Sequence, residues 1–153
     1  MECHHVKNII LIVLSLIGLS SQAAELDQLS TENAKVRAVI PGAVNTAGYL
    51  IVKNNSDKDV KLVSASSPIA ERVEFHQHLH QGGLMKMIKL DDVTVPANGE
   101  VVFESGGLHI MFLGVDSTMA NNKTANVRLM DSNGNELSVE FKVESIHQKI
   151  RHH

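Results

Sequence analysis

The sequence predicts an all-β protein, a β-sandwich or Greek-key barrel of about eight or nine short strands. Two observations lead to this fold class. Apolar and polar residues alternate with period two over most of the chain after residue 33, and clusters of Gly, Pro and Asn separate the alternating segments. A length of 153 residues without an internal repeat fits one such domain, which we place at residues 34–146.

Nine segments have the alternation or the apolar content of a strand. They are 34–40, 47–53, 59–65, 71–80, 84–90, 100–104, 108–115, 125–131 and 136–144. The last two form the clearest hairpin, because Asn133 and Gly134 lie between them. Both residue types tolerate the positive φ of a type I′ turn, so we expect that turn here.

The N-terminal residues are typical of a secretory signal peptide. An apolar run at 9–19 follows a basic residue and precedes small residues, and it is shorter than the ~20 residues that span a bilayer. We expect a signal peptide at 1–23 with cleavage after Ala23, and then a polar leader at 24–33. Cleavage one residue later and an uncleaved N-terminal anchor are the alternatives.

Cysteine content and charge exclude several classes of protein. Cys3 is the only cysteine and lies in the predicted signal peptide, ahead of the apolar run, where a lipoprotein anchor is not expected. The exported domain therefore has no disulfide, no thiolate nucleophile and no blue-copper site, which requires a cysteine beside two histidines. A net charge of −3 without a basic cluster argues against a nucleic-acid partner.

The segment 71–90 is predicted to form a hairpin around Gly82-Gly83 with histidine and methionine on one face. The simplest register pairs His76 with Lys89, His78 with Met87, and His80 with Met85. The other face carries an apolar set that we expect to pack into the sandwich: Val73, Phe75, Leu79, Leu84, Ile88 and Leu90. Core histidines would share the apolar face, so this division favours a metal site.

A second pair of the same residue types follows in the segment GGLHIMFLG at 106–114. His109 and Met111 are two residues apart and so share a strand face. Imidazoles combined with thioethers favour Cu(I), whereas zinc, calcium and magnesium prefer other ligand mixtures. A metallohydrolase would also need a carboxylate base, and we expect Glu74 on the face opposite the histidines.

The spacing of these residues resembles a known family. His76, Met87, His109 and Met111 fit the pattern H-x10-M-x21-H-x-M, within the segments GLMKM, VPANGEV and GGLHIMFLG. The pattern and its surroundings resemble the periplasmic PCu(A)C-type copper chaperones over most of the chain after the signal peptide. The resemblance implies a cupredoxin-like Greek-key β-sandwich that binds one Cu(I) at an exposed face through these four residues.

The chain departs from the family between the first histidine and the glycine turn, where members often have methionine. This chain has His78 and His80 there, and together with Met85 they are candidate additional ligands, including for a second ion, Cu(II). For Met85 a surface thioether beside the site is the plainer interpretation. The family spacing selects His76, whereas the simplest register places His78 opposite Met87, and a bulge near the turn would decide between them.

The resemblance also implies a function. Family members pass copper to the copper centre of a cytochrome c oxidase, so we expect a periplasmic, monomeric protein whose partner is an oxidase subunit or an assembly factor. We do not expect an enzyme. A copper storage or resistance protein that uses the same site as a sink is the alternative. The C-terminal segment 147–153 carries His147, His152 and His153, which are either a plain chain end or a further metal-binding tail.

Overall fold

A computed structural model describes residues 28–40, 42–116, 119 and 122–144. The predicted signal peptide, its cleavage at Ala23 and the histidine tail at 147–153 lie outside the described residues. Within the described part, regular structure consists of strands. No helix there is long and apolar enough to cross a membrane.

Ten strands follow one another along the chain. They are β1 Leu29–Arg37, β2 Asn45–Asn54, β3 Val60–Ser66, β4 Ala70–Gln81, β5 Leu84–Leu90, β6 Val93–Val95, β7 Glu100–Phe103, β8 Leu108–Val115, β9 Thr124–Asp131 and β10 Glu136–Glu144.

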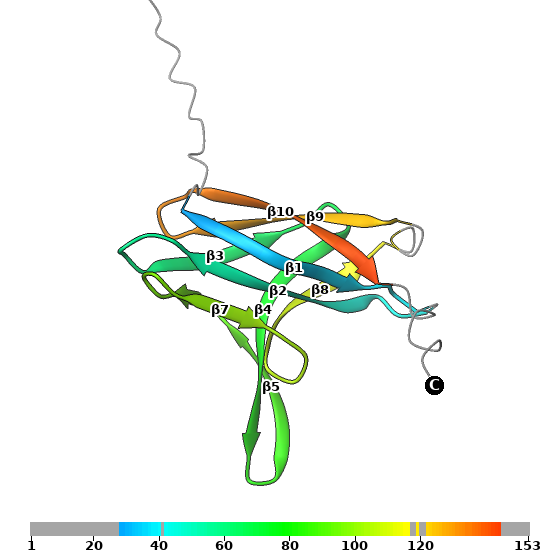
Figure 1. Ribbon diagram of the computed structural model, residues 1–153. Coiled ribbons are helices and arrows are strands. Elements are labelled where there is room, and N and C mark those ends of the chain that lie inside the picture. Colours follow the sequence, from blue (N-terminus) through cyan, green and yellow to red (C-terminus); the bar gives the residue numbers. More distant parts are fainter. Residues whose placement is uncertain (1–27, 41, 117–118, 120–121, 145–153) are drawn as a thin grey trace, which may run out of the picture.

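The strands form a closed β-barrel, which confirms the predicted all-β, sandwich-like class. Their hydrogen-bonded order is β5-β4-β8-β2-β1-β10-β9-β3-β6, and β7 pairs with β2 beside β8. A further pairing of β3 with β4, the strands next to the two ends of this order, closes a ring. β5 lies outside the ring, and the outer part of the β4–β5 hairpin extends from the barrel as an arm (Figure 1).

Two features at the strand level differ from the sequence prediction. β6 was not predicted, because a strand of only 3 residues is too short to show a recognisable alternation. β1 begins at Leu29, inside the segment predicted as a polar leader, because β2 pairs with it from that residue onward. The register shifts between Glu32 and Lys35, where Asn33 has a φ of 55°, so a bulge hides the period-two pattern of this strand.

The hairpin between β9 and β10 is confirmed, but its predicted type I′ turn is wrong. Gly134 has a φ of 84°, whereas Asn133 is not among the described residues with positive φ. The N–H of Gly134 donates to the carbonyl oxygen of Asp131 at 3.1 Å, as in a type I turn followed by a glycine bulge. The Asp131 carboxylate accepts from the N–H groups of Asn133 and Asn135, both at 2.8 Å, and so stabilises this alternative turn.

The barrel interior holds all four phenylalanines of the chain among aliphatic side chains. Phe75 and Phe103 form one ring pair with centroids 6.1 Å apart, and Phe112 and Phe141 form a second, edge-to-face pair at 6.2 Å. Phe75 comes from β4 and Phe112 from β8. These two strands are therefore anchored in the core by alternate residues, and the residues between them are directed to the outer face.

Gly48 on β2 lies against the second phenylalanine pair, which generates a stability prediction. A Cβ at this position would be 2.8 Å from Cε2 of Phe112 and 3.1 Å from Cε1 of Phe141, and both rings are fully buried. We expect Gly48→Ala to lower the free energy of unfolding in urea by about 1–3 kcal/mol. Gly107→Ala is the control, because the nearest contact of its Cβ is the flexible Glu104 side chain, at 3.3 Å. Equal stability of the two variants would contradict this packing.

Candidate metal centre

The outer face of β5, β4 and β8 carries imidazole and thioether side chains on three adjacent strands. Between β4 and β5 the pairs are His76 with Lys89, His78 with Met87, and His80 with Met85. This confirms the simplest predicted register, and the pairing continues without a shift from Phe75 to Gln81. The bulge that would have moved His76 opposite Met87 is not present in this pairing.

β8 lies against the other edge of β4 and brings in the second predicted pair of ligands. His109 is directly opposite His76, and Met111 is opposite Glu74. Residues opposite one another in a sheet point to the same face, so β8 adds its imidazole and its thioether to the face already carrying the hairpin histidines. The opposite face of β8 holds the buried Ile110 and Phe112.

Three imidazoles form a compact cluster on this face. The rings of His78 and His109 are stacked, with centroids 4.9 Å apart and an angle of 22° between the planes. The ring of His76 lies 6.0 Å from that of His109 at 49°. His109 is only 3% exposed. Met87 on β5, in contrast, is 45% exposed.

The turn before β8 fixes the protonation of His109. Its Nδ1 lies 3.1 Å from the carbonyl oxygen of Gly107. Because a carbonyl oxygen can only accept, Nδ1 carries the proton and Nε2 keeps a free electron pair. The same carbonyl accepts from the backbone N–H of His78 at 3.2 Å, so one turn holds β4 and the His109 ring in register.

Glu74 belongs to this face, and the prediction that it lies on the opposite one is wrong. Its Oε2 is 2.9 Å from Nε2 of His76, and its Oε1 is 3.1 Å from Nζ of Lys89. The physical reason is elementary, because residues two apart on a strand share a face. The spacing of Glu74 and His76 was therefore a signal in the sequence that could have identified this contact.

The Glu74 carboxylate fixes the protonation of His76. Hydrogen bonds from His76 and then from Lys89 hold the pKa of Glu74 below its usual value, so the group is ionised near neutral pH. An ionised carboxylate only accepts, so Nε2 of His76 is the donor, and the neutral tautomer with this proton has its free electron pair on Nδ1. Carboxylate–histidine pairs of this kind orient metal-ligating imidazoles and raise their basicity.

Two ring nitrogens on this face have no hydrogen-bond partner among the described residues. They are Nδ1 of His76 and Nδ1 of His78, and both are buried. An unsatisfied buried polar atom costs about 1–3 kcal/mol, so such atoms call for a partner. The rings of His76 and His78 lie beside that of His109, whose Nε2 also has a free pair, and Met87 is opposite His78 in register. This donor set fits copper, whereas hard oxygen-seeking cations would find few ligands here.

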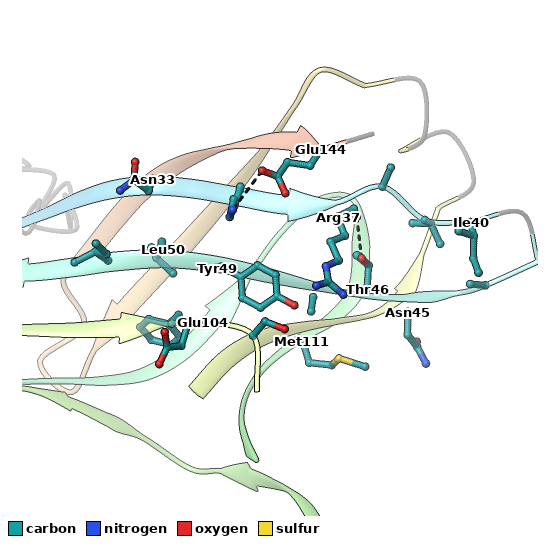
Figure 2. A pocket seen from close by; sticks show the side chains of 18 residues that line it. Asn33, Arg37, Ile40, Asn45, Thr46, Tyr49, Leu50, Glu104, Met111 and Glu144 are labelled. Carbon is teal, nitrogen blue, oxygen red and sulfur yellow. Dashed lines mark hydrogen bonds and ion pairs between the residues drawn. The ribbon is translucent and has the colours of Figure 1, made fainter. Parts of the chain in front are cut away.

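The methionines are distributed around the histidine cluster. Met87 is opposite His78, and Met85 is opposite His80 nearer the tip of the arm, where it is 60% exposed. Met111 is half-buried and lines a groove of about 950 Å³ together with Tyr49 and Arg37 (Figure 2). Among the described residues no three His, Cys, Asp or Glu side chains are grouped to hold a metal.

The structure clusters the predicted histidine ligands but leaves the two predicted methionine ligands far apart. Met87 and Met111 lie two strands and four residues apart in register, on opposite sides of the histidine cluster. With strands ~4.8 Å apart and ~3.4 Å per residue, a flat sheet would separate their Cα atoms by roughly 17 Å. One ion reaches both sulfurs only where the arm curls over β8, as the strong twist of two-stranded ribbons allows.

The apolar face of the hairpin also packs unevenly. Val73, Phe75 and Leu90 belong to or contact the buried core, as predicted. Leu79 and Leu84 do not, since they are 38% and 75% exposed. Both leucines belong to the turn end of the hairpin, and the outer part of this hairpin extends away from the barrel (Figure 1).

Burial of His109 generates a prediction about pH. Burial lowers the pKa of His109, the hydrogen bond to Gly107 raises it, and the neighbouring His78 and His76 lower it further, with a net decrease. The unfolded chain therefore binds this proton more readily, so stability is complete above the ordinary imidazole pKa of about 6.5 and declines as pH falls below it. Urea unfolding of the metal-free protein between about pH 7.5 and pH 5 measures this slope.

We expect His109→Gln to flatten the dependence of unfolding free energy on pH in that window. The control for removing one imidazole is His80→Gln, at an exposed position near the tip of the arm. A slope that is just as steep without His109 would contradict the assignment. Keeping the series above about pH 5 separates this effect from the carboxylates, whose ordinary pKa values are near 4.

Solved structures with this architecture include several PCuAC domains. The copper-bound PCuAC domain from PmoF2 is 20% identical, covers 77% of this chain and 93% of its own, and has a TM-score of 0.63. The solution structure of apo-DR1885 from Deinococcus radiodurans is 27% identical over 94% of this chain and 97% of its own, at a TM-score of 0.60. The CuI form of DR1885 is 28% identical over 84% and 83%, also at 0.60.

Sequence comparison gives a family and one curated relative. The relative is the protein RP573 of Rickettsia prowazekii (strain Madrid E), 35% identical over 68 residues. The match spans 44% of this chain and 38% of the length of that relative. The LpqE-like lipoprotein family matches over residues 29–143, from the start of β1 to the next-to-last residue of β10. The cupredoxin-like fold and the resemblance to PCu(A)C-type proteins are thus confirmed, and the chain belongs to the LpqE-like family.

Proposed function

We propose that this protein is a copper chaperone that binds Cu(I) on the outer face of β5, β4 and β8 and transfers it to a partner. The observation that carries the proposal is the pair of unpartnered, buried imidazole nitrogens of His76 and His78 beside His109. The proposed ligands are those of the family spacing, His76, Met87, His109 and Met111. The similarity to a copper-bound PCuAC domain and to the CuI form of DR1885 supports the choice of metal.

The donor set explains how such a protein could bind copper and still release it. Thioethers and imidazoles are neutral ligands, and a partner that offers thiolates would hold Cu(I) more strongly. Met87 is 45% exposed, so an incoming ligand has access to at least one position of the site. Release then proceeds by stepwise exchange, in which a partner ligand binds before a ligand of this chain leaves. No covalent chemistry is required, and we propose no enzymatic activity.

The cellular setting is part of the proposal. The predicted signal peptide at 1–23 and the absence of cysteine after Cys3 suit an oxidising compartment, where a thiolate site would be lost to oxidation. We therefore propose the periplasm as the location. The proposed acceptor is the copper centre of a cytochrome c oxidase or an assembly factor of that enzyme, and we propose that the protein acts as a monomer.

A storage or resistance protein would use the same ligands as a sink. The difference between the two functions is kinetic, because a chaperone exchanges copper rapidly with its acceptor. Mixing the Cu(I)-loaded protein with a thiolate-bearing acceptor domain, and following copper by mass spectrometry, distinguishes them. Transfer that is complete within minutes supports delivery, whereas retention by this chain supports storage.

The ligand assignment predicts that Cu(I) affinity depends on Met87 and His109. We expect Met87→Ala and His109→Ala each to lower Cu(I) affinity by more than about tenfold in competition titrations. Met85→Ala is the matched control, because Met85 is on the same strand and face but lies opposite His80 at the exposed tip. Since Met87 and Met85 are both exposed, neither variant should change the unfolding midpoint. Unaltered affinity in both Met87→Ala and His109→Ala would end the proposal.

Glu74 should influence copper binding without touching the metal. In Glu74→Gln the amide can still accept from His76, but it no longer carries the negative charge that stabilises the ring. We expect a decrease of Cu(I) affinity of about tenfold, at the lower end of the range for outer-sphere partners of metal ligands. Glu71→Gln, at an exposed position of the same strand, is the control. Identical Cu(I) affinities for the two variants would show that Glu74 does not influence the site.

A further inference from the structure

His78 occupies a position that the family spacing does not assign to the site. It is directly opposite Met87 on β5, whereas His76 is the diagonal neighbour of that methionine. Directly opposed residues have Cβ atoms ~5 Å apart, and diagonal ones are ~7–8 Å apart. Of the three clustered imidazoles, that of His78 is therefore the one nearest to Met87 by register.

The ring of His78 also contacts the buried imidazole of the site. It stacks on His109 at 4.9 Å, closer than the 6.0 Å between His76 and His109. The backbone N–H of His78 donates to the Gly107 carbonyl that also accepts from His109. The position of His78 relative to His109 is thus fixed by a shared hydrogen-bond acceptor as well as by ring contact.

The nitrogen of His78 is available to a metal. Its Nδ1 is buried and has no hydrogen-bond partner among the described residues. His76 shares this property, but its second nitrogen is held by Glu74 at 2.9 Å, which restricts the ring. His78 has no such contact to a carboxylate in the described part of the chain, and its ring is held by stacking on His109 instead.

We propose that His78 is a copper ligand of this chain, an imidazole between Met87 and His109 that lets the site hold Cu(II) as well as Cu(I). The inference rests on the proposed function, since it concerns the same face. Cu(I) accepts soft thioethers, whereas Cu(II) is better served by imidazole nitrogen. His76, His78 and His109 together supply three imidazoles. Because no three of the described His, Cys, Asp or Glu side chains are already grouped to hold a metal, binding by all three imidazoles would require their rings to reorient.

The experiment uses the full chain with a simplified set of histidines. The chain has 9 histidines, and replacing His4, His5, His147, His152 and His153 by Asn leaves the four on β4 and β8. In this background we compare His78→Phe with His80→Phe. Phenylalanine keeps an aromatic ring against His109 but has no nitrogen, so a role limited to stacking would survive. His80 is the control because it is exposed at the tip of the arm.

Two measurements are made on each variant: affinity by competition titration with Cu(I) and with Cu(II), and nitrogen coordination by electron paramagnetic resonance of the Cu(II) form. We expect His78→Phe to lose one coordinated nitrogen and to weaken Cu(II) binding by more than about tenfold, with a smaller loss for Cu(I). His80→Phe should match the background in both. An unchanged spectrum and Cu(II) affinity in His78→Phe would overturn the role of His78.

The outcomes separate this inference from the proposed function. If the background chain binds neither oxidation state of copper, the proposed function itself fails. If the background binds Cu(I) through Met87 while His78→Phe behaves like His80→Phe, only the role of His78 fails. Thermal unfolding of each metal-free variant confirms that a lost affinity does not come from a lost fold.

Discussion

The candidate site depends on the pairing of β4 with two neighbours at once. On one edge β4 aligns His78 with Met87 of β5, and on the other it aligns His76 with His109 of β8. Alternate residues of β4 and β8, such as Phe75 and Ile110, are buried in the core. Because the side-chain period of a strand is two, the core fixes which residues reach the outer face. A shift of β4 by one residue would move the histidines inward and dismantle the face.

Much of this arrangement could be predicted from the sequence because it depends on local alternation. The register around Gly82-Gly83 follows from the shortest turn that joins two alternating segments, and the structure has that register from Phe75 to Gln81. The face shared by His109 and Met111 follows in the same way. The pairing of His76 with His109 could not be inferred from local alternation, because it joins strands that are distant in the chain. Only the family spacing indicated that the two residues belong to one site.

The errors of the prediction have physical causes that are equally specific. The type I′ turn at Asn133 failed because the Asp131 carboxylate offers hydrogen bonds to a competing turn. The prediction that Leu79 and Leu84 are buried failed because alternation shows which residues share a face, but not whether the barrel continues beneath that face. The contact of His109 with the rings of His76 and His78 depends on the pairing of β4 with β8, two strands that are distant in the chain.

The arm formed by β4 and β5 has a consequence for how the protein moves. Among the described strands β5 pairs with β4 alone, and its outer residues lie beyond the core. Opening of this arm exposes little buried apolar surface, so its free energy is far below that of global unfolding. An ion bound by both Met87 on the arm and His109 on the barrel would link the two and oppose this local opening. Slowed amide hydrogen exchange in β5, with the barrel unaffected, would then be a signature of the loaded protein.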